Sequence, residues 1–277
     1  MIYASDLDRT LIYSLGALGV PEDSPDLVPA EIIEGRNASY ISQGALDLLR
    51  ELTAGVIFMP VTTRTIAEYR RINLFQETII PDYAVTSNGG NILVNGDVDH
   101  EWRSHIGRLV GFNSAAAEEV RTIVRAVVRP EWIISERYCD ELFYTYVVYR
   151  DALPLDEINH MAEHLNGLGW KVSLQGRKLY VVPEAVNKSD AIVHVRRTVR
   201  SEPMVASGDS LLDKCLLESA DYAIAPRHGE IFAEQQTSQV KLSYPFTELA
   251  GVHAGNEIMQ YVHKIYHNLT TLGVGPQ

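Results

Sequence analysis

The chain has 277 residues, of which 46% are hydrophobic, so it is long enough for a sizeable core and for more than one domain. Its 24 basic and 36 acidic residues give a net charge of −12, which argues against nonspecific binding to nucleic acid or to an anionic membrane surface. The two cysteines, Cys139 and Cys215, argue against a disulfide framework. With no apolar run of membrane length and no leader ahead of the first apolar segment, we expect a cytoplasmic protein.

The first predicted element is a buried strand over residues 1–5, followed directly by two carboxylates, Asp6 and Asp8. Open α/β sheets bind ligands at the carboxyl ends of their strands, so acids placed there are candidates for chemistry. Two acids in a short loop more often cap a helix or turn the chain, and this motif gains weight only from motifs downstream. Residues 15–36, rich in Pro, Gly and acids, are expected to form a solvated loop, with a flap over the site as the alternative.

A second apolar run, residues 56–61, predicts another strand, and a helix is expected before it at 42–52. Thr62 follows this strand, where its hydroxyl and the amides of a helix N-terminus could receive a phosphate group. A Thr that only caps the helix is an equally supported alternative. A third strand is expected at 83–87, before a turn cluster and a small hairpin that turns at Asn95 and Gly96.

The pattern of predicted helices and strands changes between residues 97 and 183. Helical patterns at 115–128 and 155–168 are each followed by two apolar runs, which lie at 132–135, 142–149, 171–174 and 178–182. Helix, strand and strand in this order, twice over, predict an α+β unit with an antiparallel sheet.

Lys188 opens a segment whose apolar residues share one helical face, so it stands in the first turn of a predicted helix. A cation there opposes the helix dipole at a cost of about 0.3–1 kcal/mol, which indicates an anion nearby. A surface lysine that tolerates this cost is the alternative, at even weight.

A fourth motif follows the predicted strand at 204–207, where Asp209 and Asp213 lie four residues apart after Gly208. Hard cations such as Mg²⁺ prefer oxygen ligands and keep several waters, which suits one or two carboxylates at a phosphate site. Taken alone, the motif is better explained as a helix N-terminus that carries stabilising acids. A last strand is expected at 222–225.

A closing helix is predicted at 259–269, and it carries two histidines four residues apart, His263 and His267. The sequence offers no evident carboxylate partner for them. We therefore expect surface residues rather than metal ligands.

Taken in order, these motifs resemble the motif set of the haloacid dehalogenase (HAD) superfamily of phosphohydrolases. The predicted α+β insertion resembles the type IIB cap, found in a branch that includes sucrose-phosphate and mannosyl-phosphoglycerate phosphatases and hydrolases encoded beside tellurium-resistance genes. The resemblance implies an α/β fold, with a Rossmann-like parallel-sheet core over residues 1–95 and 184–277 and an inserted α+β cap over 96–183.

The resemblance also implies a role for each motif. Asp6 would attack phosphorus to form an aspartyl-phosphate, and Asp8 would serve as general acid and base. Mg²⁺ is the implied cofactor, with the implied ligands Asp6, Asp209, Asp213 and the backbone carbonyl of Asp8. The implied phosphate-binding side chains are Thr62, Lys188 and Asn88. The chain departs from the usual pattern at Arg9, Thr63 and Leu212, which stand where Gly, Gly and Asn are frequent.

We therefore predict a Mg²⁺-dependent phosphatase of a small phosphorylated metabolite, with a sugar phosphate as the leading candidate. It would act as a monomer or homodimer with no nucleic-acid or membrane partner. A phosphomutase or another phosphotransferase is the alternative among enzymes, and a phosphoaspartate signalling or binding module is the alternative outside them. Asp8 favours an enzyme, because a proton-transfer group serves chiefly for turnover.

Overall fold

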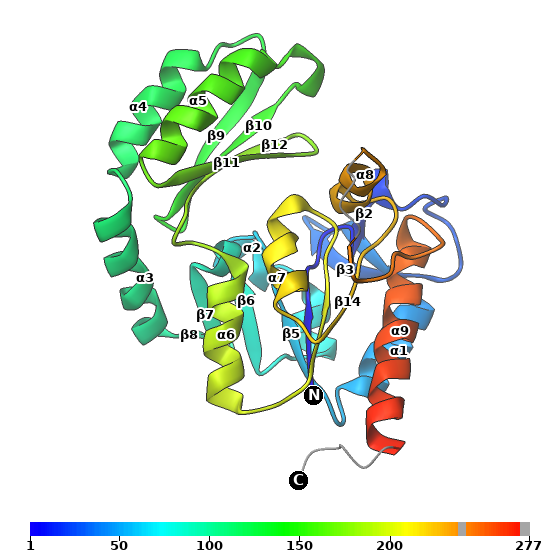
Figure 1. Ribbon diagram of the computed structural model, residues 1–277. Coiled ribbons are helices and arrows are strands. Elements are labelled where there is room, and N and C mark those ends of the chain that lie inside the picture. The colour runs from blue at the N-terminus through cyan, green and yellow to red at the C-terminus, as the bar shows by residue number, and fades with distance from the viewer. Residues whose placement is uncertain (238–241, 272–277) are drawn as a thin grey trace. The chain divides into compact units, whose positions relative to one another are not determined.

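The computed structural model describes residues 1–237 and 242–271. The chain divides into two compact units. The larger unit comprises Met1–Val98 and Lys188–Gln277, and the smaller unit comprises Asp99–Asn187. The smaller unit is therefore inserted into the sequence of the larger one, and each is described by itself below (Figure 1).

The larger unit is built on a four-stranded parallel sheet in the order β14–β13–β1–β5. Its strands are β1 (Ile2–Ser5), β5 (Ile57–Pro60), β13 (Met204–Ser207) and β14 (Tyr222–Ile224). All four were predicted from apolar runs, and β1 is buried along its whole length, as a central parallel strand should be. Ser5 pairs with Pro60 on one side and with Ser207 on the other, so the carboxyl ends of three strands meet beside Asp6.

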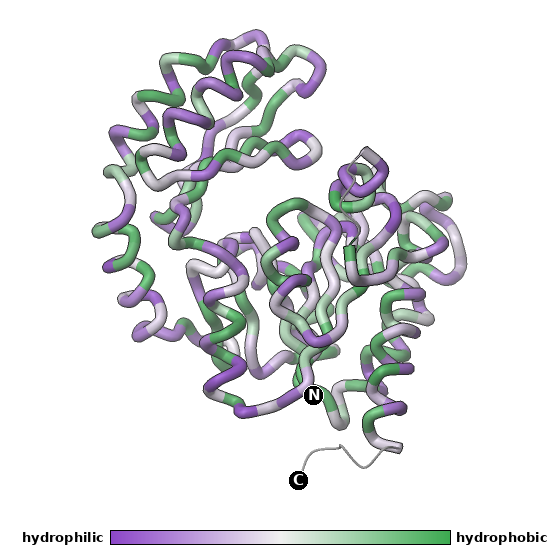
Figure 2. Tube along the Cα trace, in the orientation of Figure 1, coloured by the Kyte–Doolittle hydropathy of each residue, from purple (hydrophilic) through white to green (hydrophobic). Residues whose placement is uncertain are grey.

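Two long helices, α1 (Gln43–Leu52) and α9 (Val252–Thr271), pack against each other in the larger unit (Figure 1). The Ser42 hydroxyl caps α1 by accepting a hydrogen bond from the Ala45 N–H at 3.2 Å. Hydrophobic and hydrophilic residues alternate along α9, as expected for a helix with one buried face (Figure 2). The core between helices and sheet includes Tyr3, Phe58, Val205, Leu46, Leu49, Ile258 and Val262.

A second, antiparallel sheet of the larger unit consists of β6 (Tyr83–Thr86), β7 (Asn91–Val94) and β8 (Asp97–Val98). The predicted turn at Asn95 and Gly96 is confirmed, and both residues have positive φ (50° and 84°), as a tight two-residue hairpin requires. An isolated parallel bridge between Val61 and Val85 links this sheet to the end of β5.

The prediction of a solvated loop over residues 15–36 is wrong for its second half. After the short η1 (Leu15–Ala17), strands β3 (Leu27–Ile33) and β4 (Arg36–Ser42) form a hairpin that also pairs with β2 (Tyr13–Ser14). The strand that pairs with β3 lies almost entirely after residue 36, outside the predicted loop. In addition, β3 buries the charged Glu31, so the sequence of β3 shows no apolar alternation.

The larger unit contains further helices besides α1, α9 and η1. They are α2 (Ile66–Arg70), η2 (Leu74–Thr78), η3 (Ser87–Gly89), α6 (Lys188–Val199), η5 (Leu211–Asp213), α7 (Lys214–Glu218) and α8 (Glu230–Thr237). Helix α6 begins at Lys188, as the sequence predicts.

The smaller unit contains an antiparallel sheet in the order β11–β12–β10–β9, which confirms the predicted α+β pattern. Its elements are α3 (His100–Asn113), α4 (Ala117–Val127), β9 (Ile133–Cys139), β10 (Phe143–Val148), η4 (Arg150–Ala152), α5 (Leu155–Gly167), β11 (Trp170–Gln175) and β12 (Lys178–Pro183). Helix α3 was not predicted from the sequence, because only Trp102 and Ile106 on it are buried and leave a weak apolar stripe. Among the residues described in either unit, no helix is both long and apolar enough to cross a membrane.

Candidate active site

Four of the predicted site residues meet in one buried cluster at the carboxyl end of β1. Lys188 is 1% exposed, and its Nζ donates to Asp6 Oδ1 at 2.7 Å and to Asp213 Oδ1 at 2.5 Å. Asp209 completes the cluster, because carboxylate oxygens of the three acids all lie within 4.8 Å of one another. The anion that the position of Lys188 indicated is therefore a pair of carboxylates.

Both carboxylate oxygens of Asp213 are engaged, which fixes its orientation. Besides Lys188 on Oδ1, the backbone N–H and the hydroxyl of Ser210 donate to Oδ2 at 2.9 and 2.7 Å. Gly208 makes room for this arrangement, since a Cβ there would lie 2.5 Å from the Asp213 Cβ. Leu212 cannot hydrogen-bond through its side chain, and Ser210 and Lys188 supply the support at Asp213.

The cluster holds more negative than positive charge out of water. Burial, followed by the charge of Asp213, raises the pKa of Asp6 to about 7, although Lys188 acts in the opposite direction. Burial and then the neighbouring Asp6 raise the pKa of Asp209 well above its ordinary value. Burial acts to lower the pKa of Lys188, but Asp213 and Asp6 outweigh it and hold that pKa above its usual range. A further cation would relieve this imbalance.

Arg9, which stands where glycine is frequent, is notable for its backbone conformation and for its charge. Its φ is 64°, in the left-handed region that glycine adopts without strain. The His228 ring secures this bend, because Nδ1 accepts from the Gly251 N–H at 3.1 Å and Nε2–H therefore donates to the Arg9 carbonyl at 2.8 Å. The Arg9 Nε lies 3.3 Å from Asp209 Oδ2 and so adds a half-exposed cation beside the buried acids.

Thr62 and Asn88 lie together at the carboxyl end of β5. The Asn88 N–H donates to the Thr62 carbonyl at 3.0 Å, and both side chains are buried. The Thr62 hydroxyl accepts from the Arg64 N–H at 3.1 Å, whereas the cap of α2 is Thr65, which forms a capping box with Glu68. A helix cap therefore does not explain Thr62.

The structure places Asp8 against an arginine that the sequence analysis did not assign. Arg64 donates from Nε to Asp8 Oδ2 at 2.8 Å and from Nη2 to Oδ1 at 2.7 Å, which is a bidentate pair. Its Nη1 reaches Glu31 at 2.8 Å, and Glu31 also lies 3.3 Å from Arg71 Nε. Burial acts to lower the pKa of Arg64, but Asp8 and Glu31 outweigh it and raise that pKa above its usual value.

Only part of this network could have been found from the sequence. Arg64 lies two residues beyond Thr62 at a predicted strand end, and this position marks it as a candidate. Glu31 carries no such signal, because it reaches Arg64 only through the β3–β4 hairpin. Thr63, the third departure from the usual pattern, has a φ outside the left-handed region, so no glycine is required there.

The parallel sheet, the acids at its strand ends and the inserted α+β unit identify the chain as a HAD hydrolase of type IIB, a phosphatase. The family model of sucrose-6F-phosphate phosphohydrolase matches residues 1–240, and the chain belongs to this family. A search of curated proteins gives no match.

Solved structures share the fold at low sequence identity. The sucrose-phosphatase of Synechocystis sp. PCC6803, solved with sucrose and phosphate, has a TM-score of 0.68 and 17% identity over 94% of this chain and 97% of its own. The HAD subclass IIB sugar phosphatase BT4131 has a TM-score of 0.61 and 13% identity, with 94% and 98% covered. A trehalose-6-phosphate phosphatase related protein has a TM-score of 0.52 and 18% identity, with 96% and 98% covered.

The chemistry of the buried cluster fits a hard divalent cation. Asp6, Asp209 and Asp213 offer only oxygen ligands, and their spacing allows one ion to contact more than one carboxylate. The excess of buried negative charge also favours a cation at this position. The donor set thus agrees with the divalent metal that HAD phosphatases generally use.

Proposed function

We propose that this phosphatase hydrolyses a small sugar phosphate in a Mg²⁺-dependent reaction, through an aspartyl-phosphate formed on Asp6. One observation carries the proposal: the Asp6 carboxylate at the end of the central strand β1 lies 2.7 Å from the buried Lys188 and shares its cluster with two further acids. The family description and the sugar phosphatases among the structural relatives support the substrate class.

In this proposal Asp6 is the nucleophile, and its neighbours hold it in place. The Thr10 hydroxyl donates to Asp6 Oδ2 at 3.3 Å, and Lys188 donates to the other oxygen. When substrate binds, Lys188 and the Thr62 hydroxyl would donate to phosphoryl oxygens, with Asn88 beside them. Charge stabilisation by such fixed donors is the largest contribution expected for phosphoryl transfer.

Asp8 would protonate the leaving oxygen and afterwards take a proton from the attacking water. Positioned proton transfer contributes about 10²–10⁴ in rate. The bidentate pair with Arg64 would hold the Asp8 carboxylate in one orientation between these two steps. Arg64 is thus a positioning residue in this account.

Mg²⁺ would be held by Asp6, Asp209 and the backbone carbonyl of Asp8, with Asp213 as the third acid of the cluster. When bound, the ion supplies positive charge that offsets repulsion between the carboxylate and the phosphate. Asp213 would act mainly through Lys188, since both of its oxygens already have donors.

We propose further that the protein works in the cytoplasm as a monomer or homodimer, without nucleic-acid or membrane partners. Its acidic composition and its two thiols support this setting.

The smaller unit, in this proposal, acts as the cap that selects the substrate while the larger unit performs the chemistry. Joining Val98 to Lys188 should leave some hydrolysis of a small aryl phosphate but abolish discrimination among metabolites. A capless protein that folds and still ranks metabolites like the whole chain would contradict this division.

The experiment that tests the reaction is a panel of sugar phosphates assayed for inorganic phosphate release with Mg²⁺ and with EDTA. We expect release from at least one sugar phosphate, loss of it in EDTA, and recovery when Mg²⁺ is restored. Full activity in the chelator would contradict the metal assignment. Conversion to an isomeric sugar phosphate without phosphate release would instead identify a phosphomutase.

A further inference from the structure

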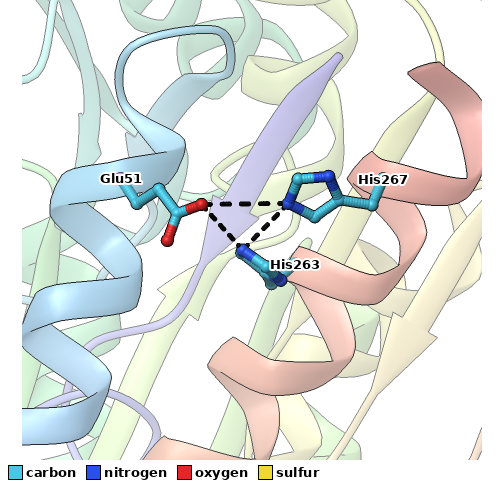
Figure 3. Close-up of side chains that lie close together, drawn as sticks. All are labelled: Glu51, His263 and His267. Atoms are coloured by element: carbon cyan, nitrogen blue, oxygen red, sulfur yellow. Dashed lines mark hydrogen bonds and ion pairs between the residues drawn. The ribbon is translucent and has the colours of Figure 1, made fainter. Parts of the chain in front are cut away.

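A second cluster of metal-ligating side chains lies on α1 and α9, outside the buried acids of the candidate active site. Glu51 comes from the last turn of α1, and His263 and His267 come from successive turns of α9. Figure 3 shows the carboxylate and both imidazole rings pointing toward one another. The structure thus supplies the carboxylate partner that the sequence did not reveal for the two histidines.

The three ligand atoms are spaced like one face of a coordination tetrahedron. His263 Nε2 lies 3.0 Å from Glu51 Oε1 and 3.0 Å from His267 Nε2, and the third side, from His267 Nε2 to Glu51 Oε1, measures 3.8 Å. Ligands about 2.0–2.1 Å from a tetrahedral Zn²⁺ are separated from each other by about 3.3 Å. Each side of the observed triangle differs from this separation by no more than about 0.5 Å, so small side-chain adjustments would bring all three atoms onto one ion.

The charges at this position also favour a cation. Glu51 stands near the C-terminus of α1, where the helix dipole disfavours an acid. The two Nε2 atoms face each other at hydrogen-bond distance, so neutral rings must adopt opposite proton arrangements to satisfy the contact. A metal ion in place of the shared proton would satisfy both nitrogens and the carboxylate together.

We propose that Glu51, His263 and His267 form a binding site for a divalent transition-metal ion, Zn²⁺ foremost, that joins α1 to α9. Two histidines and one glutamate are a known ligand set for zinc, with a fourth position open to water. Imidazole nitrogens select Zn²⁺ over Mg²⁺, so this site and the all-oxygen cluster would bind different metals. The site is partly exposed, with side-chain exposures of 27% for His263, 51% for His267 and 61% for Glu51, so the ion can enter from solvent.

The test is a Zn²⁺ titration of the whole, chelator-treated protein in excess Mg²⁺, which keeps the buried acids occupied. We expect a Zn²⁺ affinity that falls roughly tenfold to hundredfold in Glu51→Gln and in His267→Ala. At Zn²⁺ well above its dissociation constant, the melting temperature of the unaltered protein should rise by roughly 5 °C, because the ion binds only the folded pair of helices. Neither variant should show this rise.

The chain offers a matched control in α5, where His160 and His164 have the same four-residue spacing and are exposed. In the described part of the chain, no carboxylate forms a three-ligand group with them. The double variant His160→Ala/His164→Ala should therefore keep the tight site and the thermal shift. Equal Zn²⁺ affinity and equal shifts in the unaltered protein and in His267→Ala would overturn the proposal, since the three side chains would then be only a hydrogen-bonded chain. The result does not depend on the phosphatase assignment, because no step of it measures turnover.

Discussion

Two residues of the larger unit, Lys188 and Glu51, each stand at a helix end where the helix dipole disfavours their charge. Their surroundings differ completely. Lys188 begins α6, is buried, and contacts two carboxylates that are buried with it. Glu51 lies in the last turn of α1, is exposed, and contacts two histidines that water also reaches. The first cluster is buried, offers only oxygen ligands and has more acidic than basic side chains, which suits a hard cation and a phosphate. The second cluster is exposed and rich in nitrogen ligands. Its side chains keep much of their contact with water, and it is suited to a softer metal.

The largest effect is expected when Asp6, one of the two carboxylates that Lys188 contacts, is replaced. Asp6→Asn should lower phosphate release by at least about 10⁴-fold, because an amide cannot attack phosphorus. The control is Asp190, an exposed acid on α6, the helix that Lys188 begins. Asp190→Asn should retain normal turnover. Near-normal release by pure Asp6→Asn protein would remove Asp6 as the nucleophile.

The two remaining acids of the buried cluster should differ in effect. Asp209→Ala should reduce turnover by roughly 10³-fold and raise the Mg²⁺ concentration needed for half-maximal rate, because it removes a proposed ligand. Asp213→Ala should cost less, roughly 10²-fold, since Asp213 acts through Lys188 and Ser210. Mg²⁺ titrations of the rate decide the ranking, and equal losses with equal Mg²⁺ dependence would contradict it.

A smaller effect is expected at the arginine that orients Asp8. Arg64→Lys keeps the charge but loses the two-pronged contact, so kcat should fall roughly tenfold with little change in KM and with an altered pH profile. Arg71→Lys is the control, because Arg71 contacts the same Glu31 but is not bonded to Asp8. If both variants change kcat and its pH profile alike, the network is structural and Asp8 does not depend on Arg64.

The smallest effect concerns stability without metal. The pKa of Asp6 is raised to about 7 in the folded chain, chiefly by burial and then by Asp213, from an ordinary value near 3.8. Between these two values the folded chain binds more protons at Asp6 than the unfolded chain does, so the free energy of unfolding should fall as pH rises from about 4 to about 7. Urea unfolding in EDTA should show this fall, and Asp6→Asn should reduce its slope. Saturating Mg²⁺ should oppose it, because the ion binds ionised carboxylates. An identical slope for both proteins would contradict the origin of the effect.

The residues at strand ends could be predicted from the sequence because their signal is local. Each strand of the parallel sheet is an unbroken apolar run, and the polar residue that follows it must lie at the edge where neighbouring strands also end. Asp6, Thr62 and Asp209 are all of this kind. Lys188 was found by its conflict with the helix dipole, which is also a local property.

What the sequence could not reveal depends on contacts between distant segments. Glu31 reaches Arg64 only because β3 pairs with β4, and Glu51 reaches His263 only because α1 packs on α9. Arg9 shows a different limit, since its left-handed backbone lies between two hydrogen bonds with the distant His228, one from the His228 ring to the Arg9 carbonyl and one from Arg9 Nη2 to the His228 carbonyl. A buried charged residue such as Glu31 interrupts the apolar pattern of its strand, so the strand is hard to predict from the sequence.

The most direct test of the central claim is to trap the phosphorylated enzyme. Asp8→Asn should slow both departure of the leaving group and removal of the phosphoryl group, so the acyl phosphate that forms should persist. Acid quenching after prolonged incubation with a sugar phosphate, followed by borohydride reduction and peptide mass spectrometry, should locate a reduced acyl phosphate at Asp6. The account predicts homoserine at position 6 in Asp8→Asn protein with substrate and Mg²⁺, and none without substrate. A reduced residue at another position, or sustained phosphate release by this variant with no modified Asp6, would contradict it.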